Sequence, residues 1–250
     1  MKLALMSDIH ANIQALEACL AHAQAQGVGQ YAFLGDLVGY GADPVAVVQR
    51  VQTLAAAGAW VLKGNHDAMA VAPPAVATTL GDSTAGWTHQ QLSPMQRQFL
   101  DQLPLVRQEG AMLLVHATAD EPALWRYVYD ERAAGASLDG AARAPEVRYV
   151  FGGHVHAQSL YARSGDAGLM KFMPSPGVAV PLPGHSCWLA TIGSVGQPRD
   201  GNPAAGYAVF DSESLQLVFH RVDYDHPAAA RAIRRAGLPA FFADRLATAR

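Results

Sequence analysis

Three short apolar runs near the start of the chain each end in polar residues that can bind a metal ion, and this repeat constrains the fold most. The runs and the residues after them are Leu3–Met6 with Asp8 and His10, Tyr31–Leu34 with Gly35-Asp36, and Ala59–Leu62 with Gly64-Asn65-His66-Asp67. Each run has the length of a buried strand. Side chains two apart on an extended segment point the same way, so Asp8 and His10 can face one ion.

Helical patterns separate these predicted strands. One helix is expected between Ala11 and Gly27, where Asn12 can cap its start, and another between Asp43-Pro44 and Ala57. Alternation of strand and helix predicts a mainly parallel sheet with helices on both sides. Ligands bind such sheets beyond the carboxyl ends of the strands, so the polar clusters are expected to meet there.

The second half of the chain adds two further strand ends with histidines. Met112–Val115 runs into His116, and Val147–Phe151 runs into the segment that holds His154 and His156. Shorter strands are expected from Gln158 to Val222. Other segments predict helices: possible caps at about 73–104 and 120–145, and one C-terminal helix at about 227–250. With no linker long enough to divide it, the chain is expected to form a single domain over residues 1–250.

Composition limits the class of protein. Of the 250 residues, 50% are hydrophobic and 16% charged, which is ample for a packed core. The net charge of −3 and the lack of a basic run disfavour a nucleic-acid partner. Asp8 and His10 interrupt the N-terminal apolar run, which excludes a membrane span there. Two distant cysteines, Cys19 and Cys187, signal no disulfide framework, so we expect a cytoplasmic protein.

Taken together, these motifs resemble the calcineurin-like metallophosphoesterase superfamily. The pattern consists of Asp8-x-His10, Gly35-Asp36, Gly64-Asn65-His66-Asp67, a lone His116 after a strand, and Gly153-His154-x-His156. Two further segments, 35–41 and 193–201, are similar to the small bacterial and archaeal phosphoesterases of that superfamily. The resemblance implies a four-layer α/β/β/α sandwich, in which the second sheet is expected from the resemblance rather than from the sequence pattern.

Nitrogen and oxygen ligands without thiolate suit manganese, iron, cobalt, nickel or zinc. The resemblance implies two divalent ions, for which manganese is favoured, bridged by Asp36 and holding a hydroxide between them as the nucleophile. It assigns seven residues as ligands: Asp8, His10, Asp36 and His156 for one ion, and Asp36, Asn65, His116 and His154 for the other.

His66 is predicted to be catalytic without binding a metal. It follows the predicted ligand Asn65, so it can reach a bound phosphate and either stabilise its charge or protonate the leaving oxygen. In the related protein phosphatases, an aspartate three residues after the bridging one orients such a histidine. This chain has Gly39 at that position, and Asp67 is a candidate for the orienting role.

Two other residues are candidate substrate contacts. Arg199 could pair with phosphate oxygens or, equally, with Asp200 in its own loop. Tyr40 could touch the substrate or simply pack. Arginines near the C-terminus are expected on the solvent-facing side of the last helix; they are Arg231, Arg234, Arg235, Arg245 and Arg250.

The sequence therefore predicts a metal-dependent phosphoesterase whose partner is a phosphorylated small molecule or nucleotide. A phosphodiester substrate is favoured, because the small relatives without the aspartate at position 39 resemble phosphodiesterases. A protein phosphatase and a dinucleoside polyphosphate hydrolase are the alternatives within the class. A catalytically inactive scaffold is the alternative outside it, although no predicted ligand is missing. The sequence does not specify the oligomeric state.

Overall fold

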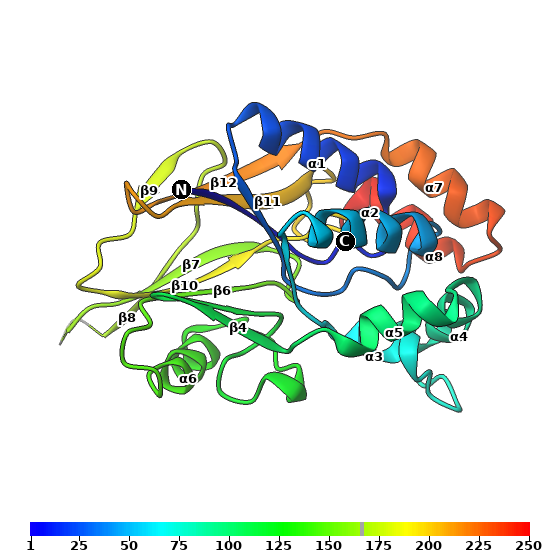
Figure 1. The fold of residues 1–250 in the computed structure, drawn as a ribbon. Helices are drawn as coiled ribbons and strands as arrows, with labels where there is room; N and C mark the ends of the chain where they lie inside the picture. The colour runs from blue at the N-terminus through cyan, green and yellow to red at the C-terminus, as the bar shows by residue number, and fades with distance from the viewer. Residues whose placement is uncertain (166–167) are drawn as a thin grey trace.

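The computed structural model describes residues 1–165 and 168–250 and contains two six-stranded sheets that face each other (Figure 1). Across the first sheet the strands are β3 (Trp60–Val61), β2 (Gln30–Phe33), β1 (Lys2–Met6), β11 (Ala205–Asp211), β12 (Gln216–Val222) and β9 (Ala179–Pro181). Across the second they are β4 (Val106–Glu109), β5 (Met112–Val115), β6 (Tyr149–Gly152), β10 (Cys187–Ile192), β7 (Gln158–Arg163) and β8 (Leu169–Phe172).

Both sheets are mixed, which corrects the expectation of one mainly parallel sheet. Strands β1, β2 and β3 are parallel to one another, as are β5, β6 and β10. The remaining neighbours pair antiparallel, and β11 joins β1 with Leu3 opposite Phe210. The N-terminal repeat of strand and helix thus builds only part of the first sheet, and the late strands complete it.

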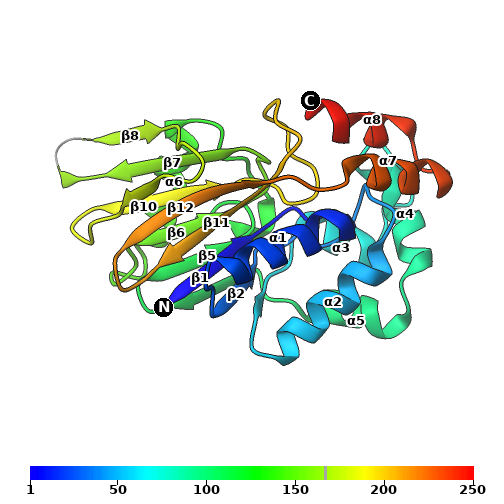
Figure 2. The ribbon, with the colours of Figure 1, turned by 90° about the horizontal axis from the view of Figure 1, so that it is seen from above.

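Helices lie on the outer faces of the sheets and beyond one end of the strands (Figure 1 and Figure 2). Those of the N-terminal half are α1 (Ile13–Ala25), α2 (Pro44–Ala56), α3 (Asn65–Val71), α4 (Asp82–Gln91) and α5 (Pro94–Gln102). Later come a 3-10 turn (Pro122–Leu124), α6 (Glu131–Ala141), α7 (His226–Arg235) and α8 (Ala240–Thr248). As predicted, Asn12 caps α1, since its side chain accepts a hydrogen bond from the Ala15 amide.

Strand β1 shows why the molecule has four layers. Its side chains alternate, so Ala4 and Met6 pack with α1 and α2, whereas Leu3 and Leu5 pack against the second sheet. All four are fully buried. Helix α6 covers the opposite side of the second sheet. Each buried leucine contributes roughly 1.5–3 kcal/mol relative to exposure, so both faces of β1 stabilise the stack.

Three predicted helical segments differ in detail. The single helix expected at 227–250 is two helices, because the chain turns at Gly237 (φ 71°) before Pro239. Within 73–104 the helices are α4 and α5, and the first of them begins only at Asp82. Within 120–145 only the 3-10 turn and α6 are helical.

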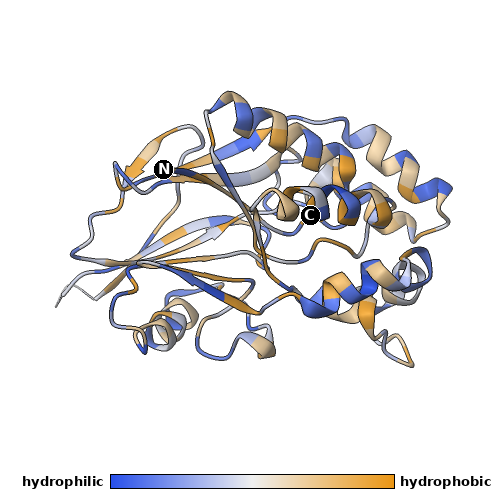
Figure 3. Cartoon of the chain, in the orientation of Figure 1, coloured by the Kyte–Doolittle hydropathy of each residue, from blue (hydrophilic) through white to orange (hydrophobic). Residues whose placement is uncertain are grey.

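Hydrophilic and hydrophobic residues lie side by side on the outer helices (Figure 3). No helix in the described residues is long and apolar enough to cross a membrane.

Candidate metal centre

All seven predicted ligands lie where strands of the two sheets end. Asp8 and His10 follow β1, Asp36 follows β2, and Asn65 begins α3 just after β3. Since β1, β2 and β3 are parallel, their carboxyl ends lie at one edge of the first sheet. The second sheet supplies the three remaining residues from the ends of β5 and β6: His116, His154 and His156.

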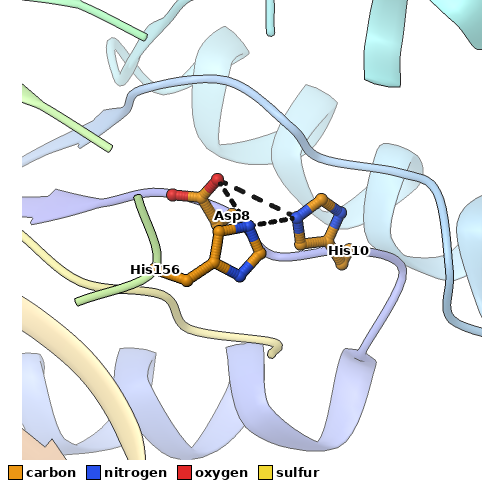
Figure 4. Close-up of side chains that lie close together, drawn as sticks. All are labelled: Asp8, His10 and His156. Carbon is orange, nitrogen blue, oxygen red and sulfur yellow. Dashed lines mark hydrogen bonds and ion pairs between the residues drawn. The ribbon is translucent and has the colours of Figure 1, made fainter. Parts of the chain in front are cut away.

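The first cluster consists of Asp8, His10 and His156 (Figure 4). The Nε2 atoms of His10 and His156 are 3.1 Å apart. Asp8 Oδ1 lies 3.3 Å from His156 Nε2 and 3.8 Å from His10 Nε2. All three side chains are buried, and each offers one ligand atom toward the same point.

The second cluster consists of Asp36, His116 and His154, with Asn65 beside it. His116 Nε2 lies 3.3 Å from Asp36 Oδ2, 3.1 Å from His154 Nδ1 and 3.2 Å from Asn65 Oδ1. Asp36 Oδ2 is also 3.8 Å from His10 Nε2 in the first cluster. Asp36 therefore stands between the clusters.

The orientation of the imidazoles favours a cation between them. His10 Nδ1 donates to the Val38 carbonyl at 3.1 Å, and His156 Nδ1 donates to the Gln197 carbonyl at 2.6 Å. With the proton on Nδ1, each Nε2 carries a lone pair. Two lone pairs only 3.1 Å apart repel unless a positive charge lies between them, so this arrangement fits a metal ion.

An unpaired carboxylate oxygen in the first cluster also favours a bound cation. Asp8 Oδ2 accepts a hydrogen bond from the His154 amide at 2.9 Å, but the buried Oδ1 has no partner among the described residues. Burial raises the pKa of Asp8, since a carboxylate without a counter-charge is costly inside a protein. A cation beside Oδ1 would remove that cost.

The second cluster also favours positive charge. Burial lowers the pKa of His116, but the carboxylates of Asp36 and Asp8 outweigh it and raise that pKa to about 9. His116 Nδ1 donates to the Leu34 carbonyl at 2.8 Å, which leaves Nε2 facing oxygen and nitrogen acceptors. The buried Asp and His triads are therefore consistent with a dinuclear metal site.

The backbone at the site is strained, which no local sequence pattern predicted. The φ angles of five predicted ligands are positive: 54° at Asp8, 48° at His10, 53° at Asp36, 66° at His154 and 62° at His156. Residues with a Cβ adopt this left-handed conformation at a cost of about 1–3 kcal/mol each. The packed ends of the strands must hold them there, which fixes the directions of the side chains before any ligand binds.

His66 lies beside both clusters, and among the described residues no carboxylate forms a hydrogen bond or ion pair with its ring. Its amide donates to Asp36 Oδ1 at 2.8 Å, and its ring centroid is 5.0 Å from that of His10 and 4.3 Å from that of Tyr40. One ring nitrogen of His66 also lies within 4.8 Å of ligand atoms of His10 and Asp36, so these three residues form a further group that could hold a metal ion. Burial lowers the pKa of His66, so the ring is neutral at pH 7.

Asp67, the candidate for orienting His66, holds the backbone instead. Its Oδ1 accepts the Leu37 amide at 2.9 Å and its Oδ2 accepts the Gly64 amide at 2.9 Å. Gly39 makes room for the His66 ring, because a Cβ there would lie 2.6 Å from His66 Nδ1.

The two candidate substrate contacts lie next to each other. The Arg199 guanidinium carbon is 5.4 Å from the centre of the Tyr40 ring, and that ring is 4.5 Å from the His10 ring. Asp200 forms an ion pair with Arg221 rather than with Arg199. Arg199 instead donates to the side-chain oxygen of Gln197.

An open groove of about 550 Å³ adjoins the second cluster. Its lining includes the aromatic side chains of Trp125 and Tyr127 and, from α3, Met69. The Tyr127 ring stacks on His154 with centroids 3.9 Å apart. Aromatic faces therefore border the place where a substrate would enter.

Sequence reasoning missed Arg245. It was expected to face solvent, but it is partly buried and donates to the Gln197 side-chain oxygen at 3.3 Å, beside Arg199. No local signal in an alanine- and arginine-rich helix distinguishes it from the neighbouring arginines.

The chain belongs to the calcineurin-like phosphoesterase superfamily, whose domain model matches residues 1–215. The motifs at the strand ends all lie within the matched region, and this class explains the buried clusters of histidine and aspartate.

Among individual proteins, the chain is similar to a metallophosphoesterase from Sphaerobacter thermophilus. The two are 31% identical, the match covers 100% of this chain and 99% of that one, and the TM-score is 0.87. An uncharacterized protein from Methanocaldococcus jannaschii is 29% identical over 98% of this chain and 96% of its own. A hypothetical protein from Pyrococcus horikoshii shares the fold, with a TM-score of 0.75 at 19% identity over 98% of this chain and 97% of that one.

Proposed function

We propose that the protein hydrolyses a phosphoric ester of a small molecule or nucleotide, with phosphodiesters preferred over phosphomonoesters. The observation that carries this is the pair of buried clusters on either side of Asp36, in which imidazole nitrogens and carboxylate oxygens face one another. Membership of the superfamily supports the reaction class. The preference for diesters rests on the sequence resemblance to small phosphodiesterases that also lack the aspartate at position 39.

In this proposal two divalent ions, with manganese preferred, bind at the clusters. Asp8, His10, Asp36 and His156 would hold one ion, and Asp36, Asn65, His116 and His154 the other. Two such ions would lower the pKa of an attacking water and would hold the phosphoryl oxygens in place. The neutral amide of Asn65 leaves net positive charge at the site, which favours an anionic substrate.

His66 is the residue we propose as catalytic. Because burial keeps it neutral, its ring can donate one hydrogen bond to a phosphoryl or leaving-group oxygen. Its ring packs between Tyr40 and His10, which limits where that donor can point.

The groove suggests the size of the substrate. Trp125 in its lining offers an aromatic face on which a planar group can stack, whereas the Tyr127 ring already stacks on His154 and on the exposed Tyr129. A nucleotide combines such a group with a phosphoric ester.

Both cysteines are free in the structure, in keeping with our proposal of a cytoplasmic location.

The test is hydrolysis of bis(p-nitrophenyl) phosphate and p-nitrophenyl phosphate by the purified protein, with manganese and after chelation. We expect metal-dependent turnover of both esters and a higher kcat/KM for the diester. His185→Gln, at an exposed histidine outside the site, is the control and should behave like the unmodified protein. Failure to turn over either ester with manganese, iron, cobalt, nickel or zinc would contradict the proposal.

A further inference from the structure

Two arginines from distant parts of the chain share one hydrogen-bond acceptor beside the candidate metal centre. Arg199 lies in the loop after β10, and Arg245 lies in α8. The side-chain oxygen of Gln197 accepts from Arg199 Nη2 at 2.9 Å and from Arg245 Nη1 at 3.3 Å. The two guanidiniums are therefore neighbours, although like charges this close repel each other.

No Asp or Glu side chain in the described residues 1–165 and 168–250 pairs with either arginine, although Arg245 Nε donates to the main-chain oxygen of Arg250 at 2.9 Å. Every ion pair formed there by an arginine with Asp or Glu belongs to another arginine. The nearest acid in sequence, Asp200, is paired with Arg221. Both Arg199 and Arg245 are partly buried, so water screens their charges less than on an open surface. Such a pair attracts an anion.

Contacts within the fold hold the two arginines in place. The Arg245 guanidinium lies over the Phe241 ring at 4.3 Å, and Phe242 packs against Tyr40 with ring centroids 4.9 Å apart. The Gly201 amide donates to the Ala249 carbonyl at 3.0 Å, which ties the end of α8 to the Arg199 loop. Little ordering is left to be done when an anion binds.

The position of the pair relates it to the first cluster. Arg199 lies over one side of the Tyr40 ring, and that ring contacts both His66 and His10. The Arg199 amide also donates to the main-chain oxygen of His156. The aromatic groove, by contrast, adjoins the second cluster, at Asn65 and His154. A substrate over the metal centre can therefore reach aromatic faces with one part and two guanidiniums with another.

We propose that Arg199 and Arg245 form a subsite for a second phosphate group of the substrate. Guanidinium groups bind phosphate oxygens through two parallel hydrogen bonds. Gln197 holds both heads in place, and Arg245 Nε also donates to the Arg250 main-chain oxygen, whereas Arg199 Nη1 and Arg245 Nη2 have no hydrogen-bond partner among the described residues. The substrate class is then a nucleotide that carries a phosphate besides the scissile one. This inference rests on the proposed phosphoesterase function and narrows it.

The test compares two chromogenic esters that differ by one phosphate: thymidine 5′-(p-nitrophenyl phosphate) and the same ester phosphorylated at the 3′ position. We expect a kcat/KM for the 3′-phosphorylated ester that is about 10- to 100-fold higher, as charge-assisted hydrogen bonds would give. Arg245→Gln should abolish most of this ratio, and Arg245→Lys should retain part of it. Arg231→Gln removes a charge from an exposed position in α7 and should keep the full ratio.

Binding gives a second readout that needs no turnover. By calorimetry, thymidine 3′,5′-bisphosphate should bind the metal-loaded protein more tightly than thymidine 5′-monophosphate, and Arg245→Gln should remove the difference. Arg199→Gln serves the same purpose if Arg245→Gln fails to fold. Equal affinity for the two nucleotides, or a difference that survives both substitutions, would overturn the inference. A protein that binds them differently but hydrolyses neither ester would instead count against the proposed function.

Discussion

At the scale of single residues, His66 is placed by its backbone and by ring contacts, with its amide on Asp36 and its ring between Tyr40 and His10. We expect His66→Ala to retain the metal content of the unmodified protein and to lower kcat by about 10²- to 10⁴-fold, the range for loss of one proton-transfer group. Metal analysis and steady-state kinetics on the same preparation check this. A large loss of bound metal would show that His66 is a ligand.

Gly39 gives a sharper test of the same ring. Its φ is +90° and a Cβ there would lie 2.6 Å from His66 Nδ1, so Gly39→Asp must displace the ring. We expect kcat to fall about as far as in His66→Ala. Gly58→Asp is the matched control, because Gly58 also has a positive φ (+104°) but no atom within 4 Å of its Cβ position.

Both glycine variants should lose about 1–2 kcal/mol of stability from the left-handed backbone, measured by urea unfolding. Only Gly39→Asp should lose activity. Equal kcat in the two variants would show that the position of the His66 ring does not matter for turnover.

At the scale of elements, one carboxylate joins the loop after β2 to the start of α3. Asp67 accepts the amides of Leu37 and Gly64, and these flank two predicted ligands, Asp36 and Asn65. In Asp67→Asn, one acceptor becomes an NH₂ group that faces an N–H. We expect a loss of about 1–3 kcal/mol in the free energy of unfolding.

Denaturant unfolding of the metal-free protein measures this loss directly. Asp130→Asn provides the control, because Asp130 caps α6 through the Ala133 amide and asparagine caps helices equally well. A change in stability no larger in Asp67→Asn than in Asp130→Asn would refute the role assigned to Asp67.

Elements with a strong local signal were predictable from the sequence. The buried run Leu3–Met6 and the cap at Asn12 predicted β1 and α1 closely. Strand β4 was missed, because Val106–Glu109 is an edge strand whose residues are mostly exposed and carry no apolar run. The break between α7 and α8 had a readable signal in Gly237 and Pro239, but the helical composition on either side masked it.

At the scale of the whole molecule, the site exists only because two sheets meet. Sequence reasoning placed Asp8 and His116 at the ends of different strands, but the distance between the sheets depends on the core between them. The left-handed backbone and the carbonyls of Val38 and Gln197 that set the imidazole tautomers depend on the same long-range packing. The candidate residues could therefore be named from the sequence, whereas their geometry depends on the assembled fold.

We propose that the two clusters hold two metal ions, with Asp8, His10, Asp36 and His156 around one of them. The most direct measurement is the number of manganese equivalents bound per chain, with hydrolysis of bis(p-nitrophenyl) phosphate followed on the same samples. We predict about two equivalents in the unmodified protein and in His185→Gln, and about one equivalent without turnover in His10→Ala. Two equivalents and full activity in His10→Ala would contradict the account.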